Sequence, residues 1–264
     1  MTSATEPTPM PAPETTGGGH RHAPALVGLF EGYGGLSHGV LDALGGGHVA
    51  AVAEIEPAMM RLLAHHYPDT PNLGDVAAID WAEWAGQVDV IVGGFPCQDV
   101  SLAGVGRGLR AGTRSGIMHA GQSLTDSVRE LLPTPDAYAG ERGAGQPPEL
   151  RRAGGHSVAL SDVAEHDLTT PATPWGKYAA AVHRWEHYTR TAPAPTAPNR
   201  NGKPQLSPLF TEWMMGLDAG LVTDPALGLT RSEQLKACGN GVVPQQATHA
   251  VRVLLGRLTR HPLT

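Results

Sequence analysis

The strongest constraint on the fold of this chain is an alternation of short apolar runs with helix-like segments in its first third. The apolar runs are short and bounded by glycine or acidic residues, which is typical of buried parallel strands. Strands that alternate with helices over about seventy residues favour a doubly wound α/β sheet. We predict strands at residues 25–30, 49–53, 72–73 and 88–92 and helices at residues 36–44 and 57–66.

The remainder of the chain lacks this regularity. Residues 1–24 are rich in Pro, Thr, Gly and Ala, and we expect a disordered tail. Beyond the last apolar run we predict a Gly- and Arg-rich loop, a helix, an irregular segment, a second helix, an extended segment and a C-terminal helix. Their respective ranges are 99–116, 117–132, 133–174, 175–188, 191–208 and 244–258.

Composition narrows the class of protein. A net charge of −6 over 264 residues argues against nonspecific coating of nucleic acid, but it permits a local basic surface. The two cysteines, Cys97 and Cys238, lie in unlike contexts and outside any metal-type cluster, so we predict no metal site and a reducing compartment. No apolar run is long enough to span a membrane, and the N-terminus lacks a signal-peptide core. We therefore expect a soluble cytoplasmic protein.

A glycine-rich turn follows the first predicted strand, in the segment Phe30-Glu31-Gly32-Tyr33-Gly34-Gly35. Glycines let a backbone approach a ligand closely, and the following helix presents its N-terminus. Glu54 closes the next strand, where a carboxylate can accept hydrogen bonds from ribose hydroxyls. A plain tight turn and an NAD site remain alternatives, although Ser37 stands where an NAD motif has its third glycine. Asp75 adds an acid at the same sheet edge, and it could equally be a helix cap.

A cysteine lies directly beyond the last strand of this region, in Gly93-Gly94-Phe95-Pro96-Cys97-Gln98. Structural cysteines lie more often inside apolar runs. A position at a strand end is exposed and rigid, as a nucleophile requires. The Arg-rich sequence that follows would favour the thiolate. Position alone leaves both the catalytic and the structural interpretation open.

Taken together, these segments resemble the motifs of C5-cytosine DNA methyltransferases in order and spacing. The matching segments are Phe30-x-Gly32-x-Gly34-Gly35, Glu54, Asp75 and Gly94-Phe95-Pro96-Cys97-Gln98. Residues 239–244, Gly-Asn-Gly-Val-Val-Pro, resemble the last motif of the family, and residues 206–216 resemble the segment that often precedes it. The resemblance covers residues 25–118 and 206–258.

The resemblance implies a Rossmann-like sheet that binds S-adenosylmethionine, the methyl donor. It implies that Cys97 attacks carbon 6 of a cytosine flipped out of double-stranded DNA, so that carbon 5 accepts the methyl group. It further implies that Phe30 and Ile55 sandwich the adenine of the cofactor. The other cofactor residues that it implies are Gly32, Gly34 and Gly35 in the loop, Glu54 on the ribose, Asp75 on the adenine amino group, and Pro96, Asn240 and Val242 along the rest of the pocket.

The loop at residues 101–116 is similar to the mobile loop that closes over DNA in this family. Its three arginines and lack of acids suit contacts with phosphate, and glycines supply hinges. A solvated loop without such a role is the alternative. The DNA-contacting residues that the resemblance implies are Gln98, Ser101, Arg107, Arg110 and Arg114.

Two motifs of the family are missing. The dipeptide Glu-Asn of its Glu-Asn-Val motif occurs nowhere in the chain, and no Arg-x-Arg is present, since Arg151 and Arg152 are adjacent. The strands that normally complete the sheet have no sequence to form them, so we expect an incomplete sheet. Three explanations stay open: an internal deletion with little activity, a split enzyme whose partner chain supplies the glutamate, or replacement by another acid such as Glu130.

Our leading hypothesis is a DNA (cytosine-5-)-methyltransferase of the bacterial restriction-modification or phage type, acting in the bacterial cytoplasm. The alternatives are an impaired or split relative that binds DNA or S-adenosylmethionine and needs a partner chain, and an NAD-dependent enzyme. We divide the chain into a tail, the first part of the catalytic domain, a small loop-rich target-recognition region, and a segment that completes the catalytic domain. These parts span residues 1–24, 25–130, 131–205 and 206–264.

Overall fold

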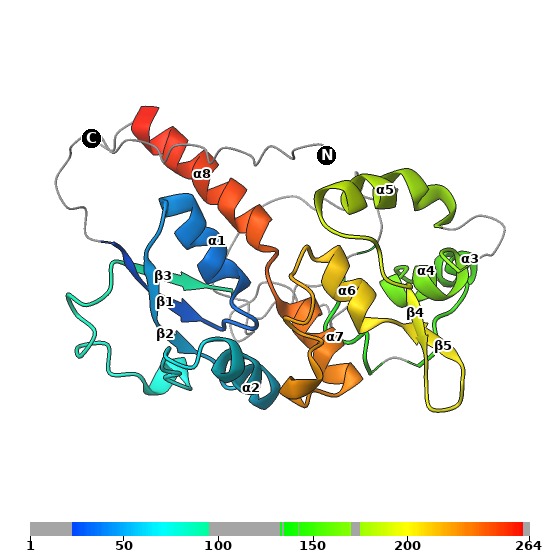
Figure 1. The fold of residues 1–264 in the computed structure, drawn as a ribbon, viewed down its shortest axis with the longest axis horizontal. Helices are drawn as coiled ribbons and strands as arrows, with labels where there is room; N and C mark the ends of the chain where they lie inside the picture. Colours follow the sequence, from blue (N-terminus) through cyan, green and yellow to red (C-terminus); the bar gives the residue numbers. More distant parts are fainter. Residues whose placement is uncertain (1–22, 95–132, 134, 142, 170–174, 261–264) are drawn as a thin grey trace, which may run out of the picture.

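The structure is a computed structural model that describes residues 23–94, 133, 135–141, 143–169 and 175–260. Figure 1 shows two lobes side by side, one built around a small sheet and one built mainly from helices. Helices α6 and α7 belong to the second lobe and lie on the side of it that faces the sheet lobe in this view. No helix in the described ranges has both the length and the apolar character needed to cross a bilayer.

The first lobe contains a parallel sheet of three strands, β1 (Ala25–Leu29), β2 (His48–Ala53) and β3 (Val90–Gly93). Their order is β2-β1-β3, so the chain starts in the centre of the sheet and then adds a strand on each side. The predicted strand near residue 72 is present as a single parallel bridge between Asn72 and Val52. The predicted α/β class with a small parallel sheet is therefore confirmed.

Three helices of this lobe lie where the sequence predicted them: α1 (Gly35–Leu44), α2 (Pro57–His66) and α8 (Pro244–Arg260). The short 3₁₀ helix η1 (Val76–Ala78) was not predicted. Helix α8 lies along α1, as Figure 1 shows, and the Thr248 hydroxyl donates a hydrogen bond of 3.0 Å to the Gly39 carbonyl. The C-terminus of the chain thus returns to the first helix of the sheet lobe.

The second lobe is more regular than we predicted. Its elements are α3 (Pro148–Ala153), α4 (Leu160–His166), η3 (Gly176–Tyr178), α5 (Ala179–Tyr188), β4 (Thr196–Pro198), β5 (Pro204–Leu206), α6 (Pro208–Met214), η4 (Pro225–Leu227) and α7 (Arg231–Asn240).

The prediction of an irregular segment at 133–174 was wrong for its described part, because this part contains α3 and α4. The buried carboxylate of Asp162 accepts hydrogen bonds from the N–H groups of Ala159 and Gln146, at 2.8 Å each. Asp162 lies within α4, and its two hydrogen bonds hold the first turn of the helix in place. The helix therefore does not depend on a long apolar pattern in the sequence. The segment at 191–208, predicted to be extended, forms the antiparallel pair of β4 and β5 before α6 begins.

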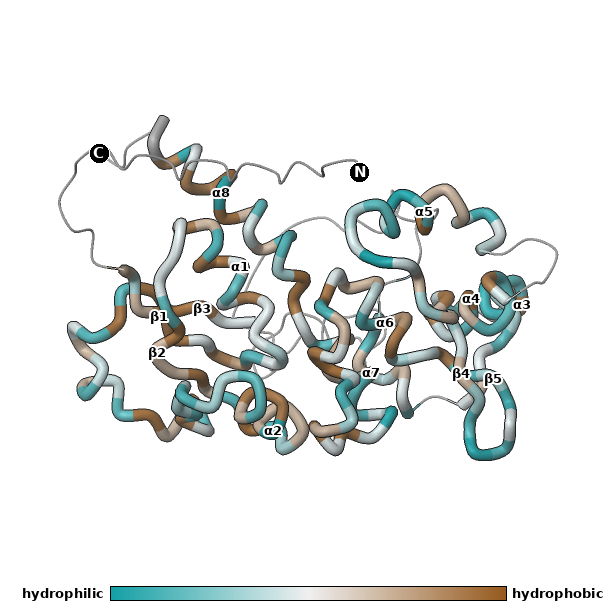
Figure 2. The backbone as a smooth tube through the Cα atoms, viewed as in Figure 1, coloured by the Kyte–Doolittle hydropathy of each residue, from teal (hydrophilic) through white to brown (hydrophobic). Residues whose placement is uncertain are grey.

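Each lobe has an apolar core of its own, and Figure 2 shows apolar stretches of the backbone tube in brown. A third core joins the lobes, since it packs Met59 and Leu62 of α2 against Cys238 of α7. The core of the second lobe joins Leu160 and Val163 of α4 to Phe210 and Trp213 of α6. It therefore runs across residue 206, where the sequence suggested the end of the recognition region. The domain division itself remains a prediction.

Candidate cofactor site

The loop after β1 crosses the edge of the sheet at which the parallel strands end. The Phe30 N–H donates to the Ala53 carbonyl at 2.8 Å, so the end of β1 stays joined to the end of β2. Gly34 has φ of 91°, a backbone conformation that favours glycine, and it begins α1. Phe30 has a positive φ of 55°, although it carries a side chain. Such strained residues occur often at ligand sites.

Glu54 organises this edge, as its position at the end of β2 predicted. Its carboxylate accepts a hydrogen bond of 3.0 Å from the Gly32 N–H, across the loop. It also accepts hydrogen bonds of 2.9 Å from the N–H groups of Ile55 and Glu56. The Asn72 side chain holds the Glu54 backbone through hydrogen bonds to its N–H and its carbonyl, at 3.0 Å each. The carboxylate is thus fixed at the surface of the sheet edge.

Two large apolar side chains flank Glu54 and face solvent. The exposed fraction is 43% for Phe30 and 65% for Ile55. Exposed apolar side chains beside a fixed carboxylate suit a ligand with a flat apolar part and hydroxyl donors. The adenosine part of S-adenosylmethionine has this chemistry, so the residues present fit the cofactor.

Asp75 is exposed and lies three residues after Asn72, which forms a parallel bridge with Val52 of β2. Its carboxylate accepts a hydrogen bond of 2.9 Å from the Ala77 N–H and caps η1. The capping alternative that the sequence left open is therefore correct for this structure. Only one carboxylate oxygen, Oδ1, accepts the capping hydrogen bond, so capping is compatible with ligand contact as well.

The C-terminal motif docks against the glycine loop, although the two are more than two hundred residues apart in sequence. The buried Tyr33 hydroxyl donates a hydrogen bond of 2.8 Å to the Val242 carbonyl. Gly241 lies against the Tyr33 ring so closely that a Cβ at this position would overlap it. The Val242 side chain lies near Gly94, at the end of β3. The predicted cofactor residues Asn240 and Val242 are thereby brought to the same edge as Gly32 and Glu54.

Ion pairs hold α7 against α2 beside this edge. Lys236 lies 2.9 Å from Glu56, and Arg61 lies 2.8 Å from Glu233. Both pairs are partly exposed and contribute on the order of 1 kcal/mol or less. They help to orient the segment at residues 240–244, and they contribute little to the stability of the fold.

Several predicted site residues lie outside the described residues. They are Pro96, Cys97, Gln98, Ser101, Arg107, Arg110 and Arg114. Gly94 is the last described position before the predicted nucleophile. The other cysteine, Cys238, is fully buried in the core, and burial raises the pKa of its thiol. A buried thiol with a raised pKa is unreactive. Within the described ranges, no group of three or more potential metal ligands occurs.

The structure adds two residues that we did not predict. Tyr33 was treated as a spacer in the glycine motif, yet it is the anchor for the C-terminal segment. Glu31 was treated in the same way, yet only 5% of its surface is exposed. Burial raises the pKa of Glu31 to about 7, an effect that hydrogen bonding from Ser37 offsets in part and that the nearby charge of Glu54 reinforces. The one sequence signal for Glu31 and Tyr33 was their size, because turns of this kind usually carry small residues.

Comparison with known proteins supports the family resemblance. Residues 25–125 match the family model described as C-5 cytosine-specific DNA methylase. A DNA N-6-adenine-methyltransferase of Escherichia phage P1 is 45% identical over 60 residues, which cover 22% of this chain and 8% of that protein. The type II methyltransferase M.NlaIV of Neisseria lactamica is 34% identical over 83 residues, which cover 30% and 19%. M.AquIA of Picosynechococcus is 36% identical over 92 residues, which cover 32% and 36%.

The chain spans well under half the length of these relatives. A solved structure of a DNMT2 variant from Spodoptera frugiperda aligns with a TM-score of 0.45 and 11% identity, and it covers 88% of this chain and 100% of that one. The match to the family model spans the segment that holds the glycine loop, Glu54, Asp75 and Cys97. Over residues 25–125, this chain is similar to the C-5 cytosine-specific DNA methylases.

Proposed function

We propose that this protein acts as a DNA (cytosine-5-)-methyltransferase that uses S-adenosylmethionine. The observation that carries the proposal is the docking of Gly241 and Val242 on Tyr33, because it closes the glycine loop with a segment from the other end of the chain. A tight turn alone would not need such a closure. The family match over residues 25–125 supports the same assignment.

The cofactor would lie along the edge formed by the glycine loop, Glu54 and Asp75. Glu54 would accept hydrogen bonds from the ribose, and its present bond to the Gly32 N–H would hold the loop in place. The exposed side chains of Phe30 and Ile55 would cover the two faces of the adenine. The loop residues Gly34 and Gly35, together with Asp75, Pro96, Asn240 and Val242, would complete the cofactor pocket. When bound, the cofactor supplies an electrophilic methyl group on a sulfonium.

Cys97 would act as the nucleophile. Its thiolate would form a bond to carbon 6 of the cytosine, and the electron pair of the 5,6 double bond would make carbon 5 nucleophilic. After methylation of carbon 5, loss of the proton on that carbon would restore the double bond and expel the thiolate. The position directly beyond β3 supports this role, since β3 ends beside Val242 of the proposed cofactor edge.

Double-stranded DNA would be the second substrate. Gln98, Ser101, Arg107, Arg110 and Arg114 follow Cys97 in sequence and would contact it. Each arginine that neutralises a phosphate should add about one to the steepness of the salt dependence of binding. Replacing all three arginines with alanine should therefore flatten the dependence of DNA affinity on salt concentration.

Trapping of a covalent complex tests the proposal. The protein is incubated with labelled S-adenosylmethionine and DNA that contains 5-fluorocytosine, in which the carbon 5 substituent cannot leave as a proton. We expect a denaturation-resistant adduct that Cys97→Ser abolishes. Cys238→Ala is the matched control, because Cys238 is the other cysteine and its thiol is fully buried. It should keep the adduct.

The identity of the methylated base in the product DNA shows which atom receives the methyl group. Hydrolysis of labelled product DNA should yield 5-methylcytosine. Since one relative is named an adenine methyltransferase, 6-methyladenine would redirect the assignment to that reaction. Binding of S-adenosylmethionine without an adduct or methyl transfer would overturn the proposed activity of this chain.

A further inference from the structure

The Asn72 side chain bonds to both acid-bearing segments of the cofactor edge. Its Oδ1 accepts a hydrogen bond of 3.0 Å from the Glu54 N–H and one of 3.1 Å from the Gly74 N–H, directly before Asp75. Its Nδ2 donates to the Glu54 carbonyl at 3.0 Å. One amide therefore joins the end of β2 to the segment that presents Asp75.

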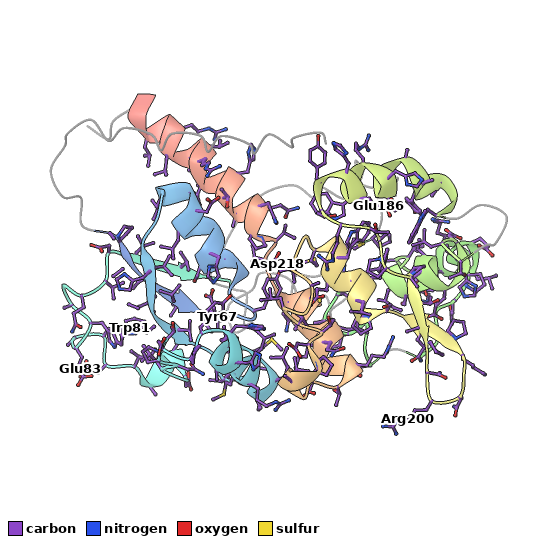
Figure 3. The ribbon with its side chains drawn as sticks, in the orientation of Figure 1. Tyr67, Trp81, Glu83, Glu186, Arg200 and Asp218 are labelled. Atoms are coloured by element: carbon purple, nitrogen blue, oxygen red, sulfur yellow. The ribbon has the colours of Figure 1, made fainter. Side chains whose placement is uncertain are left out.

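The backbone around Asn72 is held independently of its side chain. The Val52 N–H donates to the Pro71 carbonyl at 2.9 Å, and the Leu73 N–H donates to the Val52 carbonyl at 2.7 Å. These bonds make the parallel bridge beside β2. Figure 3 labels Tyr67 at the end of α2, and the chain runs from there to this bridge. Since the backbone alone keeps the segment on the sheet, loss of the Asn72 side chain should leave the fold intact.

On the side of Glu54, the effect of the amide reaches the glycine loop. The two bonds from Asn72 hold the N–H and the carbonyl of Glu54, so they set the direction in which its side chain leaves β2. The carboxylate of that side chain accepts the hydrogen bond from the Gly32 N–H. A rotation of the Glu54 backbone would therefore displace the carboxylate and the glycine loop together.

On the side of Asp75, the amide shapes a turn. Gly74 has φ of 73°, a left-handed conformation that favours glycine. Its bond to the side chain of Asn72, two residues earlier, closes a turn of the kind that asparagine side chains form. Asp75 follows this turn, and its carboxylate accepts the hydrogen bond from the Ala77 N–H. The turn thus sets the direction in which Asp75 leaves the sheet edge.

The three hydrogen bonds of the Asn72 amide are exposed. Exposed hydrogen bonds compete with water, so they add little to the stability of the fold. Their main effect is geometric, because they fix the position of Glu54 relative to Asp75. Recognition groups must be held to within roughly 0.5 Å of their binding geometry, and the side chains of two separate segments need a link to achieve this.

We infer that Asn72 is a positioning residue that couples the ribose-binding carboxylate of Glu54 to the adenine-binding carboxylate of Asp75. The inference rests on the proposed function, from which it takes the contacts of the two acids with the cofactor. Loss of the amide lets the two acids move independently, so recognition of the ribose hydroxyls and of the adenine amino group weakens together. Loss of one carboxylate weakens only its own contact, because Asn72 bonds to the backbone of Glu54 and of Gly74.

Calorimetry with three ligands measures this coupling in the full chain. They are S-adenosylhomocysteine, which has no methyl group to transfer, its analogue with an inosine base, which lacks the amino group, and its 2′,3′-dideoxy analogue, which lacks the ribose hydroxyls. The wild type should prefer the first ligand over each analogue by at least about tenfold. Asn72→Ala should reduce both preferences by about threefold or more. Glu54→Gln should reduce only the preference for the hydroxyls, and Asp75→Asn only the preference for the amino group.

Asn201→Ala is the matched control, because Asn201 is an exposed asparagine in the turn between β4 and β5. It should leave both preferences unchanged. If Asn72→Ala weakens the binding of all three ligands equally, its role is structural and the inference is wrong. The inference is also wrong if Asn72→Ala lowers one preference alone.

Amide NMR spectra of the ligand-free chain test the coupling without the cofactor. Asn72→Ala should shift the resonances of Gly32 and Ala77, whose N–H groups bond to the two carboxylates, as well as those of Glu54 and Gly74. Unshifted resonances of Gly32 and Ala77 would overturn the inference. If the wild type fails to bind S-adenosylhomocysteine, the proposed function fails, and the NMR result still decides whether Asn72 couples the two acids.

Discussion

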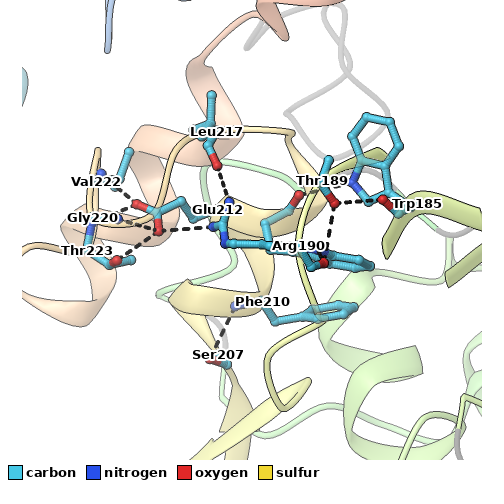
Figure 4. Close-up of polar contacts among 11 residues, drawn as sticks. Trp185, Thr189, Arg190, Ser207, Phe210, Glu212, Leu217, Gly220, Val222 and Thr223 are labelled. Carbon is cyan, nitrogen blue, oxygen red and sulfur yellow. Dashed lines mark hydrogen bonds and ion pairs between the residues drawn. The ribbon is translucent and has the colours of Figure 1, made fainter. Parts of the chain in front are cut away.

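Two buried glutamates, one in each lobe, show opposite solutions to the same physical problem. Glu212 of α6 is completely buried, and its carboxylate accepts hydrogen bonds from the N–H groups of Gly220, Val222 and Thr223 and from the Thr223 hydroxyl. Arg190 lies 3.7 Å away, and Figure 4 shows this arrangement. Glu31 is almost as deeply buried, but it has one hydrogen bond and no cationic partner in the described residues.

The difference separates an acid with a complete set of hydrogen bonds from one with an incomplete set. Glu212 ties the loop 217–224 to α6, so all the capacity of its carboxylate serves the fold. In Glu31, one carboxylate oxygen has no hydrogen-bond partner within the described part of the chain. Burial alone therefore does not identify a functional carboxyl, because the same depth of burial goes with complete and with incomplete hydrogen bonding.

The largest expected effect comes from replacing Glu212, whose carboxylate has a complete set of hydrogen bonds. Glu212→Ala leaves buried N–H donors and Arg190 without their acceptor, so it should lower the free energy of unfolding by about 3–5 kcal/mol. Urea denaturation followed by tryptophan fluorescence measures the change, because Trp213 follows Glu212 directly. A loss below about 1 kcal/mol would show that water replaces the carboxylate easily, and the contrast between the two acids would collapse.

Replacing Glu31, whose hydrogen bonding is incomplete, should change the free energy of unfolding in the opposite direction. Since burial raises the pKa of Glu31 from 4.5 to about 7, the unfolded chain ionises this group more readily than the folded chain does. Its contribution to stability is present below pH 4.5 and is lost as the pH rises through about 7. Glu31→Gln should therefore raise the free energy of unfolding at pH 8 by up to roughly 3 kcal/mol.

The pH dependence provides the control for that variant. Urea midpoints of the wild type should fall between pH 4.5 and 7 relative to those of Glu31→Gln, and the two should converge at lower pH. A constant difference across this range would mean that the effect arises from packing and not from ionisation of Glu31.

A smaller effect is expected where the glycine loop meets the C-terminal segment. Tyr33→Phe removes the hydrogen bond to the Val242 carbonyl and should cost about 1 kcal/mol. The loss should be local, so hydrogen exchange should accelerate at Gly241 and Val243 more than in α6. Uniform acceleration throughout the chain would contradict a specific role of Tyr33 in seating the C-terminal segment.

The smallest effect is expected at an exposed ion pair. Asp42 and Arg252 join α1 to α8 at 3.2 Å, with side chains 63% and 59% exposed. Asp42→Ala should change the free energy of unfolding by less than about 0.5 kcal/mol. Thermal unfolding at low and at high salt measures this change. A larger loss that persists at high salt would show that this pair, rather than the apolar contacts, holds α8 in place.

Sequence reasoning worked best where local patterns and tertiary contacts agree. The strands β1, β2 and β3 and the helices α1 and α2 were predicted within one or two residues of their observed bounds. It missed α3 and α4, because α4 starts from hydrogen bonds to Asp162 and not from an apolar period. In the site, Glu54 and Asp75 were predicted from strand ends, while Glu31 and Tyr33 were passed over as spacers.

By itself, the sequence determined the parallel α/β start of the fold and the order of the motifs, since short apolar runs, glycine turns and terminal acids express local chemistry. Only the tertiary structure decided which distant groups meet. Tyr33 and Val242 come together because α8 lies along α1 and returns the C-terminal segment to the sheet. Whether Glu31 and Glu212 are satisfied or left open depends on donors supplied by other elements, and no local pattern in the chain records where those donors lie.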